Sequence, residues 1–400
     1  MAKKPKGSGV RRRDRHAALL IYTSYGVVLP KVVGGDGLKR RVFLARPLVG
    51  EAELNAVRKV FDTGFLTDGE VTREFENRIA NDVGAKFCVA SSSGTTAIEL
   101  SLRAVGVAGR EVVVPDLTYA ATADAVISAG GIPILVDVDI PHGNVSADAI
   151  EAAIGPRTAC ILPVSLFGNP LETDVYEVCA KNGIPVVEDA ANSLGAEVGG
   201  RRVGSLADAS CFSFHPRKIA TTGEGGAVTT DNSEIESSCR SFKTFGSADG
   251  HFLTHGTNYK LSNILAAIGL VQLDRLEYLI RVRREKASVY DELLSKVEHV
   301  VTPVERGGSR CTYQTYVIYF DRDGLRDKAM KALSGENVES QIGAHALHVH
   351  PAFSSLRRIG DLRRATDLYN RLLALPLHHE LANEDQRRIC DIILETTNRN

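Results

Sequence analysis

One lysine, Lys218, has the local surroundings of a reactive amine rather than of a solvated surface charge. It follows the apolar stretch Ala209–Phe214, which predicts a short strand, and Pro216, which cannot donate to a β-ladder and ends that strand. The run Ala227–Thr230 predicts the returning strand, so we expect Lys218 on the turn between two buried strands. Burial lowers the pKa of a lysine and frees its amine, which suits Schiff-base formation with a carbonyl.

A second chemical group, Asp189, closes an upstream apolar run. Ile184–Val187 predicts a fully buried strand, with Glu188 and Asp189 at its C-terminal end. Ligands of open α/β sheets bind outside the carboxyl ends of the strands. A single acid at this place is more simply explained as a helix cap. Asp189 indicates a ligand-binding site only in combination with Lys218.

A third segment, Ser91–Thr96, is a turn of small residues between an expected strand, Lys86–Ala90, and an expected helix, Ala97–Val105. The free amides and dipole at such a helix start favour an anion, although a Ser/Thr helix cap is the alternative. A lysine, an aspartate and an anion cradle together fit pyridoxal 5'-phosphate (PLP). The lysine would bind its aldehyde, and the aspartate would keep its pyridine nitrogen protonated.

Three segments together carry a resemblance to a known family: EDAANSLGA from Glu188, GSLADASCFSFHPRK from Gly204 and TTGEGGAVTT from Thr221. From about Phe43 to its C-terminus, the chain resembles the DegT/StrS family of PLP-dependent sugar aminotransferases. The resemblance implies the aspartate-aminotransferase fold, which is PLP-dependent transferase fold type I. Its large α/β domain has a mixed, mainly parallel sheet, and its C-terminal α/β domain is smaller.

The resemblance also implies which side chains bind the cofactor. Tyr119 would stack on the pyridine ring, and Asn192 would contact the ring oxygen at a position where the family usually has His or Gln. In the family, the asparagine equivalent to Asn258 reaches the phosphate in the neighbouring subunit, which implies a homodimer with shared active sites. The phosphate contacts within the chain would come from Gly94, Thr95, Thr96 and Ser213.

The chain departs from the family pattern in the loop Thr63–Gly69, which in the family lies near the sugar site. Where the family often carries Gly-Pro, this chain has Asp68-Gly69-Glu70. The shape of this loop and its substrate contacts therefore stay open.

Strands and helices alternate between the phosphate-binding turn and Asp189, which favours a mainly parallel sheet with helices on both faces. We expect a large cofactor-binding domain over residues 43–280 and a small C-terminal domain over residues 281–400. Residues 1–42 are rich in Lys and Arg and are expected to form a basic, disordered extension. A signal peptide is the alternative, but Thr23 and Ser24 interrupt the apolar run that it would need.

The composition of the chain limits its domain number, its partners and its location. A length of 400 residues suffices for two domains, and a net charge of −1 gives no reason to expect a nucleic-acid or acidic-membrane partner. No apolar run is long enough for a membrane span. The 7 cysteines are scattered without a CxxC pair, which favours reduced thiols and a cytoplasmic location. His345, His348 and His350 alternate, but no acidic or Cys partner stands at ligand spacing, so no metal is expected.

We therefore expect an aminotransferase that moves an amino group from an amino acid, with glutamate favoured, to a keto sugar, with a nucleotide-linked one favoured. Lys218 would anchor the cofactor and act as general acid and base, and Asp189 would fix the charge of the ring. Sugar dehydratases of the same family carry histidine at the lysine position, so Lys218 argues against that reaction. Amination of a cyclitol or another non-sugar ketone, and a non-catalytic sensor on the same scaffold, remain as alternatives.

Overall fold

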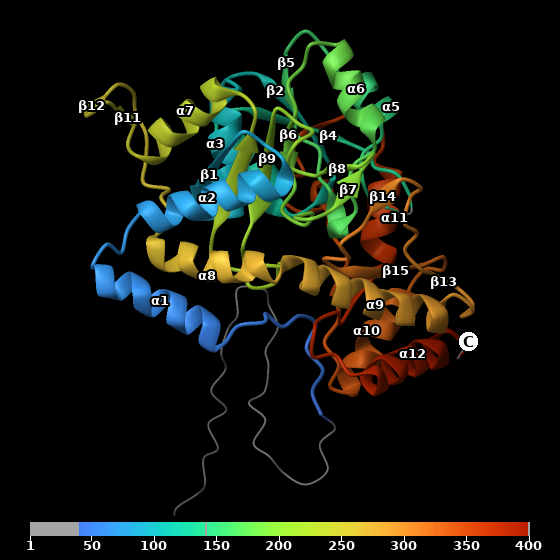
Figure 1. Cartoon of the computed structure of the whole chain (residues 1–400). Coiled ribbons are helices and arrows are strands. Elements are labelled where there is room, and N and C mark those ends of the chain that lie inside the picture. Colours follow the sequence, from blue (N-terminus) through green and yellow to red (C-terminus); the bar gives the residue numbers. More distant parts are fainter. Residues whose placement is uncertain (1–39, 141, 399–400) are drawn as a thin grey trace, which may run out of the picture. The chain divides into compact units, whose positions relative to one another are not determined.

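The computed structural model describes residues 40–140 and 142–398 (Figure 1). The expected basic extension, residues 1–42, lies outside the described residues apart from its last three. From Arg41 onward the chain forms one compact unit. The expected domain boundary at residue 280 remains a prediction.

A large sheet is built from strands of the first two-thirds of the described chain and one later strand, β18. Two four-stranded ladders join through parallel bridges at Ile161–Val186 and Val164–Asp189. Every pairing in the joined sheet is parallel except those of β10, which runs antiparallel to both of its neighbours. The strands in spatial order are β18 (Arg357–Arg358), β4 (Ile132–Val136), β2 (Glu111–Pro115), β5 (Thr158–Ile161), β6 (Val187–Asp189), β9 (Ala209–Ser213), β10 (Gly226–Thr230) and β1 (Phe87–Ser91).

Helices cover both faces of this sheet because successive strand side chains point to opposite sides. On β2, Val112 and Val114 enter one apolar core, and Val113 enters another on the opposite face. The first face is covered by α3 (Gly94–Ala104), α4 (Ala120–Ser128) and α7 (Ser233–Lys243). The second is covered by α2 (Glu70–Val83), α5 (Ala147–Ala153), α6 (Thr173–Lys181) and α8 (Asn263–Asp274). The expected mainly parallel sheet with helices on both faces is therefore confirmed.

The C-terminal part has its own antiparallel sheet and its own apolar core. A strand of four buried residues, which was not predicted from the sequence, lies between the helices that begin at Arg363 and Asn383. The segment Leu372–Leu375 is fully apolar, and its length suits a strand better than a helix. This sheet, in spatial order, consists of β13 (Val300–Val301), β15 (Tyr316–Phe320), β19 (Leu372–Leu375) and β16 (Gln341–Ile342).

The remaining elements connect these two sheets or cover them. The helices are α1 (Glu51–Thr63), α9 (Leu276–Leu294), α10 (Leu325–Gly335), α11 (Arg363–Arg371) and α12 (Asn383–Asn398), with 3-10 turns at Leu166–Gly168 and Leu347–Val349. The short strands are β3 (Leu117–Thr118), β7 (Glu197–Val198), β8 (Arg201–Arg202), β11 (Ser247–Ala248), β12 (His251–Phe252), β14 (Ser309–Arg310) and β17 (His345–Ala346). All 7 cysteines are buried and unpaired. Within residues 40–140 and 142–398, no helix has both the length and the apolar character to cross a membrane.

The contact between α8 and α2 depends on a glycine. A Cβ on Gly269 would lie 2.4 Å from the ring of Phe75, whose side chain is fully buried. We expect Gly269→Ala to lower the free energy of unfolding by about 1–3 kcal/mol, because the packed ring has no free space to enter. Gly335→Ala, at the end of α10, is the control, since its Cβ would meet nothing within 4 Å. Urea titrations of both variants measure the difference, and equal midpoints would contradict the close packing.

Candidate active site

Lys218 lies on a hydrogen-bonded turn between β9 and β10. Its backbone N–H donates to the carbonyl of His215 at 2.8 Å, and the Phe214 N–H donates to the carbonyl of Gly225 at 2.8 Å across the base of the hairpin. The Lys218 side chain is half-buried, and its Nζ donates to Oδ1 of Asn192 at 2.8 Å. The turn expected from the sequence is present, and it brings the lysine to the segment that follows β6.

Asp189 is the last residue of β6, which pairs in parallel with β9. Its carboxylate is buried, and it accepts hydrogen bonds from the Thr122 hydroxyl at 2.7 Å and from the Ala191 N–H at 3.2 Å. Neighbouring parallel strands end at the same edge of the sheet, so Asp189 and the lysine turn lie at one place.

The two opposite charges act on one another in this buried site. Burial lowers the pKa of Lys218 to about 8, and the negative charge of Asp189 opposes that shift. Burial also raises the pKa of Asp189, while the hydrogen bonds from Thr122 and Ala191 and the charge of Lys218 oppose that rise. An amine with a pKa near neutrality can take up and release protons under physiological conditions.

The turn Ser91–Thr96 lies directly against the lysine hairpin. A Cβ on Gly94 would lie 2.7 Å from the Ser213 Cβ, and a Cβ on Gly226 would lie 2.1 Å from the Ser93 carbonyl oxygen. Glycine at both positions therefore allows the start of α3 to approach the end of β9. This contact places Ser213 beside the first turn of α3, where the backbone amides lack helical partners.

The helix-cap alternative for this turn is also present in the structure. Ser93 is the N-cap of α3, and its hydroxyl accepts a hydrogen bond from the Thr96 N–H at 3.2 Å. The Thr96 hydroxyl donates to the Ser93 carbonyl at 2.9 Å. Both polar groups of Thr96 are thus used in capping, and a phosphate contact from this residue remains a prediction, as do those from Gly94 and Thr95.

Tyr119 is the N-cap residue of α4, and the residue is 51% exposed. The threonines on either side of it bond to each other, from the Thr118 hydroxyl to the Thr122 hydroxyl at 2.8 Å, and Thr122 in turn binds Asp189. The Tyr119 ring meets that of His345 at a centroid distance of 6.3 Å. Tyr119 therefore belongs to the same locality as Asp189, and its stacking role remains a prediction.

Asn258 precedes a residue that is bonded to the phosphate-binding turn of its own chain. It is exposed and forms an isolated bridge with Thr244. The carbonyl of the next residue, Tyr259, accepts a hydrogen bond from the Ser92 N–H at 2.9 Å. Its reach into a partner subunit remains a prediction.

Sequence reasoning missed the polar residues that support this site. Thr122 stands 67 positions before its partner Asp189, and no local pattern indicates that pairing. The buried Glu188 binds the hydroxyls of Ser165 and Ser210, and burial raises its pKa.

The alternating histidines have partners other than a metal in this structure. His348 Nδ1 lies 2.6 Å from the buried Asp116 carboxylate, and His345 Nδ1 lies 3.2 Å from His350 Nε2. No group of three or more metal-ligating side chains occurs within the described part of the chain.

Comparisons with known proteins show a family resemblance over most of the chain. A model of the DegT/DnrJ/EryC1/StrS aminotransferase family matches residues 47–394. The chain is 35% identical over 359 residues to GDP-perosamine synthase of Caulobacter vibrioides, covering 87% of this chain and 96% of that protein. It is 33% identical to UDP-2-acetamido-2-deoxy-3-oxo-D-glucuronate aminotransferase of Pseudomonas aeruginosa, covering 84% and 93%. A crystal structure of the aminotransferase TlmJ from Streptoalloteichus hindustanus superposes with a TM-score of 0.85 at 31% identity, covering 89% and 98%.

The lowered pKa of Lys218 predicts how its amine reacts with pH. Competitive acylation of the cofactor-free protein, followed by peptide mass spectrometry, should give a midpoint for Lys218 near pH 8, below the ordinary lysine value of 10.5. Asp189→Asn should move the midpoint lower still, because the carboxylate charge raises the pKa of Lys218. A midpoint near 10.5 in both proteins would show that the amine is solvated.

Proposed function

The chain belongs to the DegT/DnrJ/EryC1/StrS aminotransferase family, and from that premise we propose that it aminates a keto sugar carried on a nucleotide. As a member of this family it is a PLP-dependent aminotransferase with the expected type I fold. Support for the acceptor comes from the two relatives, whose names specify a GDP-linked and a UDP-linked sugar. We propose glutamate as the amino donor.

The residues present fit PLP. Lys218 offers a half-buried amine with a lowered pKa, and the Asp189 carboxylate stands at the neighbouring strand end. The close approach of Gly94 to Ser213 joins a helix start to a hydroxyl, which is the donor set that a phosphate needs. We propose that Gly94, Thr95, Thr96 and Ser213 hold the phosphate, Tyr119 covers the ring, and Asn192 and Asp189 bind its polar atoms.

The chemistry divides between the cofactor and the chain. When bound, PLP supplies an electron-withdrawing ring that stabilises negative charge at the carbon that loses a proton. The Nζ atom of Lys218 would hold the cofactor covalently and, when free, would move the proton at that carbon as base and then as acid. Asp189 would place its negative charge near the ring nitrogen and so favour the protonated ring. One observation carries this proposal: the Lys218 amine, held by Asn192, faces the charge of a buried Asp189.

The assignment of Lys218 predicts a label and a loss of function. Borohydride reduction of the holoenzyme should leave a pyridoxyl group on Lys218, and Lys218→Ala should abolish turnover. Lys218→Arg should also be inactive although it keeps the charge, because a guanidinium cannot form the covalent link. A label on another lysine would refute the assignment.

The function itself is tested in two half-reactions. Glutamate should bleach the near-visible absorption of the holoenzyme, and a nucleotide-linked keto sugar should restore it. Restoration only by a cyclitol ketone or another non-sugar ketone would replace the proposed acceptor, and a spectrum that no amino acid changes would favour a non-catalytic sensor.

We also propose a homodimer in which Asn258 of one subunit completes the site of the other. Large apolar side chains are exposed around this region, including Phe65 at 76%, Phe252 at 77% and Leu253 at 70%. Phe252 lies on the β11–β12 hairpin, which projects from the sheet domain at the upper left of Figure 1. Exposed apolar groups of this size are typical of an interface.

Subunit exchange tests the shared site. Mixing Lys218→Ala with Asn258→Ala protomers should restore part of the activity at limiting cofactor, because one site of each mixed dimer carries both intact residues. Loss of the asparagine alone should weaken cofactor binding by about 1–3 kcal/mol. An active protein that sediments as a monomer would remove the basis of this proposal.

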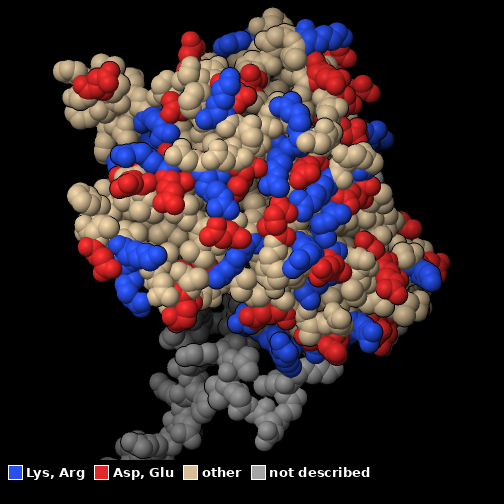
Figure 2. Space-filling model, in the orientation of Figure 1, with Lys and Arg blue, Asp and Glu red and all other residues tan. Residues whose placement is uncertain are grey.

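We propose a cytoplasmic location and small-molecule substrates without a nucleic-acid or membrane partner. The seven unpaired, buried thiols suit a reducing compartment. Basic and acidic side chains are interspersed over the face shown in Figure 2 rather than gathered by sign.

A further inference from the structure

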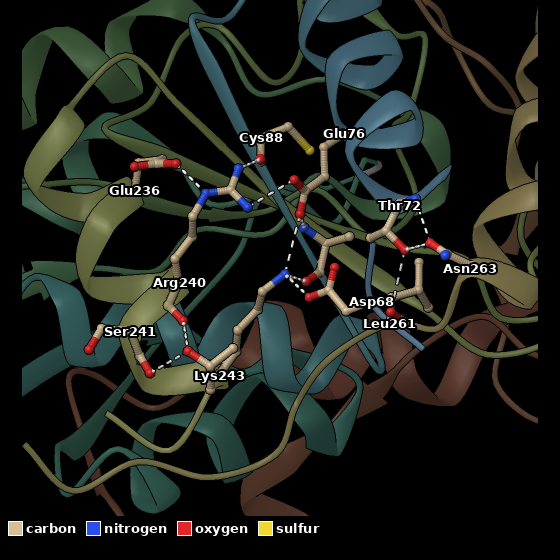
Figure 3. Close-up of polar contacts among 12 residues, drawn as sticks. Asp68, Thr72, Glu76, Cys88, Glu236, Arg240, Ser241, Lys243, Leu261 and Asn263 are labelled. Atoms are coloured by element: carbon tan, nitrogen blue, oxygen red, sulfur yellow. Dashed lines mark hydrogen bonds and ion pairs between the residues drawn. The ribbon is translucent and has the colours of Figure 1, made fainter. Parts of the chain in front are cut away.

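The strand that leads into the phosphate-binding turn, β1, is the last strand of its sheet, yet its outer backbone groups are paired. Side chains take the place of a neighbouring strand. Arg240 donates to the Cys88 carbonyl at 2.9 Å, Glu76 accepts from the Ala90 N–H at 2.7 Å, and Lys243 donates to the Ala90 carbonyl at 2.9 Å. Figure 3 shows Arg240 and Lys243 reaching this edge from α7, and Glu76 reaching it from α2 on the other face.

The pairing continues into the turn itself. The Ser92 N–H donates to the Tyr259 carbonyl, and the Tyr259 N–H donates to the Lys243 carbonyl at 3.1 Å. The outer edge is therefore bonded at residues 88, 90 and 92 in succession, and the last of these lies within Ser91–Thr96. Movement of Lys243 would act on the turn through both its side chain and its backbone.

The charges in this edge are buried, and they are paired with one another. The Lys243 side chain is 2% exposed, and its Nζ lies 3.3 Å from the Glu76 carboxylate, which is 3% exposed. It also lies 3.1 Å from the carboxylate of Asp68, which is 20% exposed. A buried ammonium needs several acceptors in fixed directions, so Lys243 has little freedom to leave the Ala90 carbonyl.

Asp68 ties a second loop to the same amine. It belongs to the connection between α1 and α2, whose Phe65 carbonyl accepts from Asn263 Nδ2 at 2.9 Å. The Thr67 carbonyl accepts from the Asn263 N–H at 3.2 Å. The loop that departs from the family pattern at Asp68 is thus fixed at three points to α7 and α8.

We infer that Lys243 is a positioning residue for the cofactor phosphate, and that Asp68 and Glu76 fix its amine in that role. With the edge of β1 bonded in this way, the turn is held in its binding conformation before the cofactor arrives. Preorganisation of this kind raises affinity, because the ordering of the turn is completed on folding. The inference rests on the proposed phosphate site and adds residues that act on it through the backbone of β1 and of the turn.

The test separates phosphate binding from the rest of cofactor binding. Cofactor-free wild type, Lys243→Met and Asp68→Asn are each titrated with PLP and with pyridoxal, which lacks the phosphate. Lys243→Met keeps the length of the side chain but removes its charge, and Asp68→Asn removes only one of the two carboxylate partners. Lys181→Met is the matched control, because Lys181 is 75% exposed and pairs with Glu151 in an exposed ion pair.

We expect Lys243→Met to reduce the ratio of PLP affinity to pyridoxal affinity about tenfold or more, which corresponds to about 1.4 kcal/mol. Asp68→Asn should reduce it less, and Lys181→Met should leave it unchanged. An unchanged ratio in Lys243→Met, including equal losses for both ligands, would show a general structural role and overturn the inference.

Two other outcomes are possible: Lys243→Met does not fold, or the wild-type protein shows no preference for PLP. If Lys243→Met does not fold, Asp68→Asn decides alone, since its partly exposed carboxylate can be replaced with less disturbance. A wild-type protein that does not prefer PLP to pyridoxal would instead refute the proposed phosphate site, and this inference with it.

Discussion

The burial of two opposite charges at one edge of a parallel sheet is the constraint on which the rest of the site depends. Lys218 must lose enough hydration for its pKa to fall to about 8, yet it must keep a partner that prevents a larger fall. Asp189 meets that need from the adjacent strand, and Thr122 and Ala191 stabilise its negative charge by hydrogen bonds. The parallel pairing of β6 with β9 sets the distance between the two groups, so the sheet determines the electrostatics of the site.

The site also requires the backbone of the phosphate-binding turn to lie close to the backbone of the lysine hairpin. The turn Ser91–Thr96 can reach the end of β9 only because Gly94 and Gly226 lack side chains, as the short distances to Ser213 and Ser93 demonstrate. Any larger residue would separate the helix start from the lysine hairpin. The antiparallel strand β10 makes this geometry possible, because it returns the chain from Lys218 between β9 and β1.

The edge of β1 illustrates how a sheet can end without losing order. An unpaired edge normally leaves backbone groups to water or to another chain. Here charged side chains from helices on both faces form hydrogen bonds with those groups, so the edge of the strand is bonded up to the turn. One of these residues, Lys243, also pairs with Asp68, so a single buried amine contacts both the β1 edge and the loop between α1 and α2.

The sequence by itself determined the chemistry and the class of fold. Lys218 between two apolar runs formed where it was expected. The other two local patterns formed with shifted bounds: β6 begins at Val187 and includes Asp189, and α3 begins at Gly94 instead of Ala97. Local patterns could not reveal Thr122 beside Asp189, His348 beside Asp116 or Lys243 beside Asp68, because these partners are separated by many residues and meet only through packing. The strand Leu372–Leu375 was missed for a related reason: the periodicity of a short apolar run does not distinguish a buried strand from a buried helix, and pairing with β15 and β16 completes the strand.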